Sequence, residues 1–568
     1  MIHIRFRELL RCFWLLCLLV PGFTLVQAQE DFYNTYSFSR ADTLRGMLRP
    51  ERTCYDVYYY DLFVRVQVDR QWIEGYVDIY YKALADFSTL QLDLYANMAI
   101  EKVTSGEKKL NFRRQGDAFF VQFENTQPKG STGQLRVYYF GAPRVAKNPP
   151  WDGGFVWSTD DKGNPWVGVA CEGDGASLWW PNKDHLSDEP DSMSIRISVP
   201  AGLTCVANGN LRQTAPDGDM QRFDWFVSYP INNYNVTINI AKYAHLEDVY
   251  QAADGEKLAL DYYVLAYNKD KAASHFKQVQ QVLAAFEHYF GKYPFWRDGF
   301  ALVETPYLGM EHQSAIAYGN QYMRGYLGGM IPPDMDWDYI IVHETGHEYF
   351  GNSVSCNDIA EMWIHESFTT YMEALYVEYA YSYADAVRYL NSQRPFIRNQ
   401  EPILGPMGVN FDNWQGSDHY YKGAWMLHSL RHAIGNDEQW WALLKEFYSR
   451  SSYSNVTTID FITFVNKFTG TNFSPFFEQY LTYPGIPVFQ YQLQQKEDGL
   501  KLRYRWKCDV PGFDMPMQVG DPARYTQIQP ITGEWREIVL EGMKIKDFRV
   551  ATELFYVKKQ ELKQDKGN

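Results

Sequence analysis

The stretch "IIVHETGHEYFGN", residues 340–352, decides how the centre of this chain is interpreted. His343 and His347 stand four residues apart, so on an α-helix both imidazoles project from one face toward a common point. Two neutral imidazoles suit a zinc ion, and Glu344, directly after the first histidine, is placed to act on a water molecule there. A partly buried helix with incidental histidines would give the same letters, so the rest of the chain has to support a metal site.

Length and charge limit the class of protein. The 568 residues are too many for one hydrophobic core and predict about three or four domains. Hydrophobic residues make up 46% of the chain and charged residues 22%, which is a globular composition. The formal net charge is -15, and losing the three Arg and one Glu of residues 1–28 would make it -17. A chain this acidic has no electrostatic reason to bind nucleic acid or an anionic membrane surface.

Residues 1–28 are typical of an export signal. Three arginines precede or begin an apolar run (residues 12–26), and Ala28 fits a small-residue cleavage site. The alternative is an uncleaved membrane anchor, which Pro21 and Gly22 disfavour because they interrupt a run that is already short for a bilayer. No later segment is apolar enough to cross a membrane. We therefore expect an exported protein, periplasmic or secreted, without stable membrane insertion once the signal is removed.

The cysteines indicate no disulfide-built scaffold. Signal removal would leave an odd number, widely scattered and without the paired spacing of metal ligands. One or two disulfides are compatible with export, but the sequence does not say whether any forms. The remaining cysteines are Cys54, Cys171, Cys205, Cys356 and Cys508.

Hydrophobic periodicity changes twice along the chain. After the signal, residues 29–245 contain short alternating runs such as "WIEGYVDIYYKA", which predict an antiparallel β domain. Helical periodicity dominates residues 246–484, interrupted by the strand-like run "GFALVETPYLGMEH". Residues 485–568 return to strand patterns in "YPGIPVFQYQL" and "EWREIVLEG". The fold class is therefore multi-domain α+β, in the order β, α-rich, small β.

A third metal ligand is expected from the next helix. The pentad lies in a predicted helix over residues 338–349, and a second helix is predicted over 360–379. A catalytic zinc takes three protein ligands, and Glu366 follows His347 after eighteen residues, which lets the helices lie antiparallel. His365 is the competing ligand, but it points about 100° away around the helix. Glu373, two turns after Glu366, is either an outer partner of a zinc histidine or solvated helix surface.

These spacings resemble the gluzincin aminopeptidases, the family of aminopeptidase N and leukotriene hydrolase. Three more motifs support the resemblance, and together with the pentad HETGH (343–347) they extend over roughly residues 170–487. "PYLGMEH" (306–312) resembles the family's glycine-x-methionine-glutamate-asparagine strand, and "HYYKG" (419–423) resembles its tyrosine-x-lysine-glycine segment. "CEGDGASLWWPNKDH" (171–185) resembles the stretch that ends the family's N-terminal β domain. Several ordered matches are more specific than one pentad.

The resemblance implies a fold and a set of roles. The domains would be an N-terminal antiparallel β domain, a thermolysin-like catalytic domain and a small C-terminal β-sandwich, in an exported, bacterial-like member without the large helical C-terminal domain of many relatives. One zinc ion per chain would be held by His343, His347 and Glu366. Glu344 would act as general base and Tyr420 would stabilise the oxyanion, with Tyr421 as the neighbouring alternative.

The resemblance also implies peptide substrates with a free N-terminus. Glu311 and Glu172 would bind the α-amine, although Glu172 could simply border a glycine-rich loop. Gly309 and Met310 would form the substrate-edge strand, and Tyr307 would line the first side-chain pocket. Departures from the family pattern include Leu308 and His312 on this strand, and Thr345-Gly346 and Glu348-Tyr349 on the metal helix; none removes a ligand or the base.

Two other functions are weighed against peptide hydrolysis. One branch of the family also hydrolyses lipid epoxides, and Asp412 falls where that branch has a needed aspartate, but Gln415 stands where a second tyrosine is expected. An inactive binding protein would be expected to lose ligands or the base, whereas all four residues are kept here. The preferred N-terminal residue, the peptide length limit and the oligomeric state are not encoded in any recognisable pattern.

Overall fold

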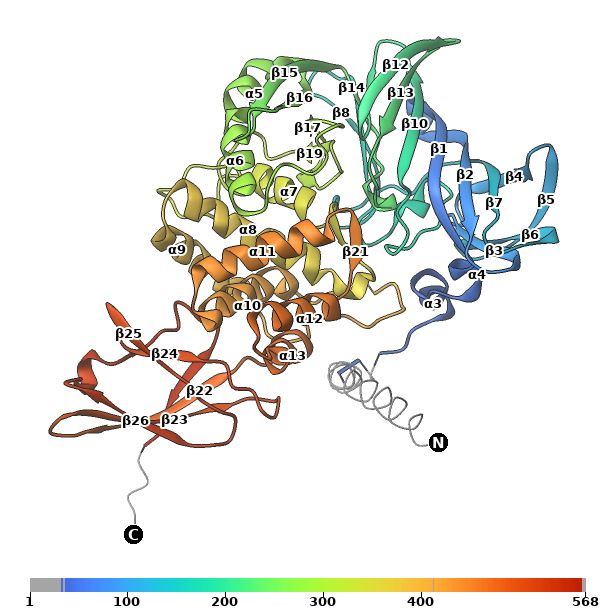
Figure 1. Ribbon diagram of the computed structural model, residues 1–568. Coiled ribbons are helices and arrows are strands. Elements are labelled where there is room, and N and C mark those ends of the chain that lie inside the picture. Colours follow the sequence, from blue (N-terminus) through green and yellow to red (C-terminus); the bar gives the residue numbers. More distant parts are fainter. Residues whose placement is uncertain (1–31, 34–35, 412, 564–568) are drawn as a thin grey trace, which may run out of the picture.

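The computed structural model describes residues 32–33, 36–411 and 413–563. The predicted export signal and Asp412, on which the epoxide interpretation depends, lie outside these residues. Within them, no helix combines the length and the apolar character that crossing a bilayer requires. Figure 1 shows a β-rich region at the N-terminal side, a central helical region and a second β-rich region near the C-terminus. This order is the one predicted from the sequence.

The N-terminal region is built on a large sheet, in which ten strands of the described chain are hydrogen-bonded side by side. Along β1 (Tyr55–Gln67), buried residues alternate with less buried ones, as the sequence pattern predicts. A smaller sheet contributes Val167 and Ile240 to the same hydrophobic core. In sheet order, the large sheet contains β12 (Asn210–Asp217), β13 (Met220–Val227), β10 (Ser192–Pro200), β1, β2 (Trp72–Ala83), β7 (Thr132–Gly141), β4 (Ala99–Ser105), β5 (Lys108–Gln115), β6 (Ala118–Gln127) and β3 (Phe87–Asp93). The small sheet contains β11 (Thr204–Val206), β14 (Asn239–Ala241), β9 (Pro165–Ala170) and β8 (Gly154–Thr159).

One strand pair departs from the predicted antiparallel arrangement. β1 and β10 run parallel, with Leu62 opposite Ile195, whereas the other described pairs of the large sheet are antiparallel. A parallel pair needs a long connection. The chain between β1 and β10 supplies one, because it first forms β2 to β7 and then strands β8 and β9 of the small sheet.

The central region combines a mixed sheet with the helices. Its first strand, β15, begins at Tyr243, so the expected boundary after residue 245 falls inside this strand. Its edge strand, β18 (Gly309–Met310), lies at the junction with the N-terminal region, because Met310 is buried in that region's core. The sheet order is β15 (Tyr243–Gln251), β16 (Lys257–Leu265), β17 (Phe300–Glu304), β19 (Ile316–Tyr318) and β18. The main helices are α5 (Lys269–His275), α6 (Val279–Tyr289), α7 (Tyr339–Tyr349), α8 (Trp363–Ala380), α9 (Tyr383–Gln393), α10 (Asp418–Ile434), α11 (Asp437–Ser451), α12 (Thr458–Thr469) and α13 (Ser474–Thr482).

Helices α7 and α8 lie at the centre of this region (Figure 1). α7 begins after Asp338, whose carboxylate accepts hydrogen bonds from two N–H groups of the first turn and so caps the helix. Gly346 lets α8 approach closely, because a Cβ there would stand 3.0 Å from Cγ2 of Thr369. His343 contacts Glu373 while the later residue His347 contacts the earlier Thr369, so the two helices run antiparallel, as the connection length predicts.

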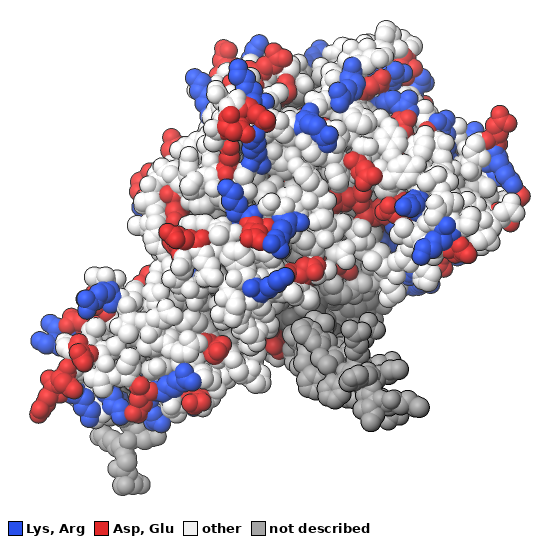
Figure 2. Space-filling view, in the orientation of Figure 1, with Lys and Arg blue, Asp and Glu red and all other residues white. Residues whose placement is uncertain are grey.

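The C-terminal region consists of two small sheets that share a core containing Phe489, Trp506 and Val519. This arrangement agrees with the predicted β-sandwich. All five described cysteines are free thiols, so none of the disulfides compatible with export is present. One sheet contains β26 (Arg536–Glu541), β23 (Gly499–Lys507), β22 (Val488–Gln495) and β28 (Lys558–Glu561), and the other contains β25 (Arg524–Ile528), β24 (Met517–Asp521) and β27 (Arg549–Val550). On the face shown in Figure 2, acidic and basic side chains are interspersed over all three regions.

Candidate functional site

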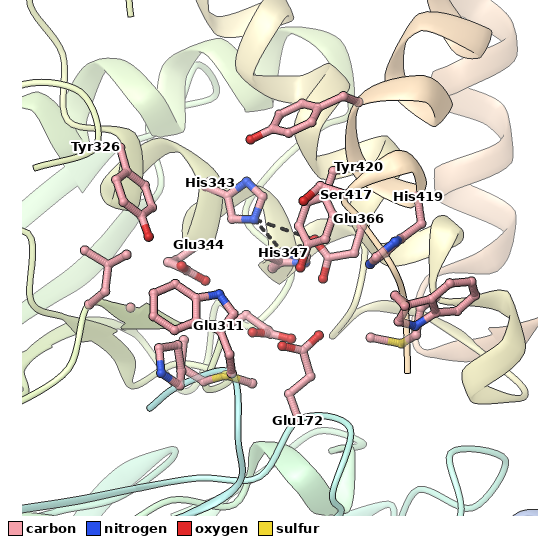
Figure 3. Close-up of a pocket in the computed structure, with 18 of the residues that line it drawn as sticks. Glu172, Glu311, Tyr326, His343, Glu344, His347, Glu366, Ser417, His419 and Tyr420 are labelled. Carbon is pink, nitrogen blue, oxygen red and sulfur yellow. Dashed lines mark hydrogen bonds and ion pairs between the residues drawn. The ribbon is translucent and has the colours of Figure 1, made fainter. Parts of the chain in front are cut away.

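Three side chains from α7 and α8 converge at one point in a cavity of about 710 Å³. The Nε2 atoms of His343 and His347 are 3.1 Å apart. Oε2 of Glu366 lies 3.7 Å from the first of these nitrogens and 3.4 Å from the second. All three residues are buried. Figure 3 shows them facing one another, with the carboxylates of Glu172, Glu311 and Glu344 beside them.

This arrangement fits a zinc ion. In a tetrahedral site with ligands about 2.0–2.1 Å from the metal, neighbouring ligand atoms stand about 3.3–3.4 Å apart, close to the observed separations. Oε2 of Glu366 is buried and has no hydrogen-bond partner among the described residues. A cation between the three atoms would satisfy this oxygen. Two histidines and one glutamate are also a donor set that zinc takes in catalytic sites, with the fourth position left open.

The other ring nitrogen of each histidine is held by an oxygen. Nδ1 of His343 lies 2.6 Å from a carboxylate oxygen of Glu373. Nδ1 of His347 lies 3.0 Å from the carbonyl oxygen of Phe350, and because a carbonyl can only accept, this nitrogen carries the proton. Nε2 of His347 therefore presents a lone pair to the metal point. Glu373, which the sequence left between an outer partner and a solvated residue, is fully buried and contacts the histidine.

We expect Glu373→Gln to weaken zinc binding about 10–100-fold, because a neutral amide holds the His343 ring less firmly and makes it a poorer donor. A competition titration with a coloured chelator measures the change in dissociation constant. Tyr389→Phe is the matched control, since it removes only the hydroxyl that donates to the far oxygen of Glu373 and should have a smaller effect. Equal affinities for the wild-type protein and Glu373→Gln would contradict the role assigned to this carboxylate.

Glu344 faces the cavity beside the metal point. Gly309 makes room for it, because a Cβ at that position would stand 2.7 Å from Oε1 of Glu344. Burial raises the pKa of Glu344 to about 8; the imidazoles of His343 and His347 oppose this shift, and the carboxylates of Glu311 and Glu366 add to it. A divalent cation at the metal point would lower this pKa and favour the carboxylate form that accepts a proton.

A second group of carboxylates suits a positively charged ligand. Oxygens of Glu172, Glu311 and Glu366 lie within 4.8 Å of one another. Burial raises the pKa of Glu311, with His347 opposing and Glu366 adding to the shift, and the Tyr234 hydroxyl donates to this carboxylate at 3.1 Å. Carboxylates this close repel one another unless a cation lies between them. An ammonium group beside the metal point would relieve this repulsion and donate charge-assisted hydrogen bonds to these carboxylates.

Of the residues expected to contact substrate on or beside edge strand β18, Tyr307 does not line the cavity. Gly309 and Met310 line the cavity, as does Leu308. Tyr307, expected to line the first side-chain pocket, is not among the lining residues. Its hydroxyl donates to the carbonyl of Val169 at 3.1 Å and its ring lies against Gly168, so it packs toward the N-terminal region.

The structure distinguishes Tyr420, the expected hydrogen-bond donor to the oxyanion, from the neighbouring alternative Tyr421. Tyr420 lines the cavity, with its ring 6.1 Å from the ring of His343. Burial raises the pKa of Tyr420, and Glu366 and Glu172 raise it further, so the hydroxyl keeps its proton. Tyr421 also lines the cavity, but its ring packs on Phe396. His365 turns away and accepts the backbone N–H of Cys356 at 2.8 Å, so Glu366 and not His365 is the residue of this helix that faces the two histidines.

Sequence reasoning missed an aromatic wall that depends on contacts far apart in the chain. Trp414 lines the cavity and its ring lies 4.8 Å from that of His419. Behind it, Phe411 packs on Trp414 at 5.4 Å and on Tyr33 at 5.4 Å, and Phe38 adds a further ring contact. The residues just after the predicted signal therefore support one wall of the cavity. No local pattern links them to residues 409–414, so only the folded chain shows the contact.

Comparisons with known proteins agree with this geometry. Residues 274–480 match the Peptidase family M1 domain. Aminopeptidase B of Mus musculus is 23% identical over 418 residues, which cover 69% of this chain and 60% of that protein. Aminopeptidase N of Streptomyces lividans is 22% identical over 353 residues, covering 57% of this chain and 39% of that protein. The matched residues thus span less than two thirds of the length of these curated relatives.

A solved structure shows a similar fold over more of its length. An M1 zinc metallopeptidase mutant from Deinococcus radiodurans, bound to the substrate Tyr-Ser-Ala, has a TM-score of 0.62 and 18% sequence identity. The match covers 75% of this chain and 94% of that one. A two-domain M1 zinc metallopeptidase mutant bound to L-tryptophan has a TM-score of 0.64 and 19% identity, with the same coverage. At this identity the likeness concerns the fold.

Proposed function

The chain belongs to the aminopeptidase N-type gluzincin family, with a peptidase family M1 domain, and we propose that it is an exported zinc-dependent aminopeptidase. It would hydrolyse the first peptide bond of peptides that have a free N-terminus. The observation that carries this proposal is the presence, in one cavity, of a three-ligand metal point and a group of carboxylates suited to an α-ammonium. Export is proposed from the sequence of residues 1–28 alone; a mature protein that begins at Gln29 would support it, and an intact Met1 would contradict it.

The proposed reaction uses groups already aimed into the cavity. A single zinc ion held by His343, His347 and Glu366 would polarise the scissile carbonyl and activate a water molecule. Glu344 accepts the proton of the attacking water and then delivers it to the departing amine. The Tyr420 hydroxyl, which stays protonated, donates to the oxyanion of the tetrahedral intermediate.

The exopeptidase character would come from Glu172 and Glu311. Their carboxylates bind the α-ammonium next to the metal point, so the first peptide bond is the one that reaches Glu344. Glu172 lies on the segment that follows β9, and Glu311 directly follows β18. Both the N-terminal and the central regions are therefore needed to complete the site.

A panel of aminoacyl fluorogenic substrates, free and N-acetylated, tests this function. We expect the free substrates to be hydrolysed and the acetylated ones to react at least about 100-fold more slowly, because acetylation removes the charge that the carboxylates of Glu172 and the buried Glu311 would bind. A zinc chelator should abolish turnover and added zinc should restore it. Equal turnover of blocked and free substrates would contradict the amine-binding role, and turnover that survives metal removal would contradict the zinc mechanism.

A further inference from the structure

Arg398 is distinctive among the described residues that line the cavity, because it is the only lysine or arginine there. The other fixed charges on the wall are the four carboxylates of Glu172, Glu311, Glu344 and Glu366, and these are explained by the metal, the catalytic proton and the α-amine. The proposed mechanism uses no permanently charged lysine or arginine side chain. Arg398 is thus a charged group in the cavity to which that mechanism assigns no role.

The backbone of Arg398 is fixed to the helix that carries Tyr420. Asp418, the first residue of α10, is buried and accepts the backbone N–H groups of Arg398 at 2.7 Å and of Asn399 at 2.6 Å. Because Tyr420 is two residues further along the same helix, Arg398 keeps a constant position relative to the proposed oxyanion donor. The side chain lines the cavity on its exposed side, and its backbone is held to α10.

The side chain of Arg398 is oriented without an ion pair among the described residues, although burial raises the pKa of the Glu401 carboxylate and the charge of Arg398 opposes this larger effect. One guanidinium nitrogen donates to the carbonyl oxygen of Gln415. Gly416 allows the stem to lie close, because a Cβ there would stand 3.0 Å from Cδ of Arg398. Among the described residues, no carboxylate lies within ion-pair distance of this guanidinium. A guanidinium has five N–H donors in a planar fork that matches a carboxylate, so most of its donors are left for a ligand.

We propose that Arg398 binds a carboxylate of the substrate on the leaving-group side of the scissile bond. This inference rests on the proposed aminopeptidase function and adds a substrate class to it: short peptides with a free C-terminal carboxylate. The cavity then has opposite charges for the two ends of a zwitterionic peptide. Glu172 and Glu311 receive the ammonium, and Arg398 receives the carboxylate.

The size of the cavity agrees with this substrate class. A cavity of about 710 Å³ is in the range of ordinary ligand pockets and has room for a short peptide. A tripeptide held at its ammonium end would bring its C-terminal carboxylate across the cavity. The carboxylate could also belong to an acidic side chain in a longer peptide, because the guanidinium recognises the same group in both.

The test compares Leu-Ala-Ala as the free acid, Leu-Ala-Ala amide and Leu-Ala-Asp amide in the zinc-loaded wild-type protein and in Arg398→Gln. A leucyl anilide without any carboxylate gives the reference rate for each protein, so that a general change in activity cancels from the ratios. We expect the wild-type protein to prefer the free acid to the amide about tenfold in kcat/KM, and Arg398→Gln to bring this ratio close to one. Preference for the aspartyl amide as well would show that a side-chain carboxylate is also accepted; preference for the free acid alone would assign the site to the C-terminus.

Arg388→Gln is the matched control, because it removes an exposed arginine of α9 that does not line the cavity. An acid-to-amide ratio that is the same in Arg398→Gln and the wild-type protein, or a ratio of one in both, would overturn the proposal. Binding of the same acid and amide peptides, measured by thermal shift, gives a second readout. If no substrate were hydrolysed, the proposed function would fail, while a binding preference for the acid that Arg398→Gln removes would still support the carboxylate site.

Discussion

Glu344→Gln should lower kcat for aminoacyl substrates by about 10²–10⁴-fold while zinc stays bound at the wild-type level. The amide fills the same space against Gly309 but cannot take a proton from the attacking water. Glu344 is not one of the three proposed ligands, His343, His347 and Glu366, so the metal content should not change. Steady-state kinetics together with elemental analysis of the dialysed protein measure the two quantities separately.

Glu348→Gln is the matched control for this substitution. Glu348 lies one turn later on α7, is fully buried and does not line the cavity. Oε1 of Glu348 accepts the N–H of Ser314 at 2.8 Å, which the oxygen of a Gln amide can also accept. Oε2 lies 3.2 Å from the hydroxyl of Tyr293, to which the amide NH2 can donate instead, because that hydroxyl can donate to the carbonyl oxygen of Gly299. We expect a small change in kcat. A similar loss in both variants would show that the effect comes from disturbing the helix, and a fully active Glu344→Gln would exclude the general-base role.

The features predicted well from sequence are those whose cause lies within one or two helical turns. The spacing of His343 and His347 predicts the shared face, and Asp338 is a polar residue at the predicted start of the helix, where it caps α7. The eighteen residues before Glu366 predict an antiparallel second helix, which the contacts between α7 and α8 confirm. The order of the β, helical and β regions follows equally from local periodicity.

The features that sequence could not settle depend on which neighbour covers a residue. The sequence around Glu373 is equally compatible with a solvated side chain and with one buried against a histidine. The side chain is buried because α9 packs over α8, and Tyr389 and Gln393 of α9 both donate hydrogen bonds to it. The resemblance to the family predicts that Tyr307 lines the pocket, but in the structure its ring packs against Gly168 of the adjoining N-terminal region. In both cases the deciding contact comes from another element.

Arg398 and Trp414 illustrate the same limit at longer range. Both belong to the irregular chain between α9 and α10, where no periodicity predicts which side chains turn inward. Arg398 is placed by Asp418, twenty residues later, and Trp414 by Phe411 and the aromatic residues that follow the predicted signal. The metal chemistry is therefore readable from local motifs, whereas the walls that would select the substrate come from loops whose contacts are non-local.

Glu366→Gln should remove both zinc and activity, and its zinc content distinguishes it from Glu344→Gln. Gln keeps the shape of the side chain but not the negative charge that two imidazoles and a divalent cation share. In the metal-free site, burial raises the pKa of Glu366, but His347 and His343 outweigh it and hold this pKa well below its usual range, so the wild-type ligand is ionised. We expect a larger loss of zinc affinity than the roughly 10–100-fold expected for the outer partner Glu373.

Zinc titration followed by thermal denaturation gives a readout that does not depend on turnover. A ligand that binds only the folded state stabilises it by about 2.7 kcal/mol at one hundred times its dissociation constant. The wild-type protein and Glu344→Gln should gain this stability when zinc is added, and Glu366→Gln should not at the same zinc concentration. Glu361→Gln is the control, because Glu361 is buried just before α8 and accepts the N–H of Thr458 at 2.6 Å, outside the cavity. If Glu366→Gln gained as much stability from zinc as the wild-type protein, the third ligand would have to be another residue, and the antiparallel pairing of α7 and α8 would no longer account for the metal centre.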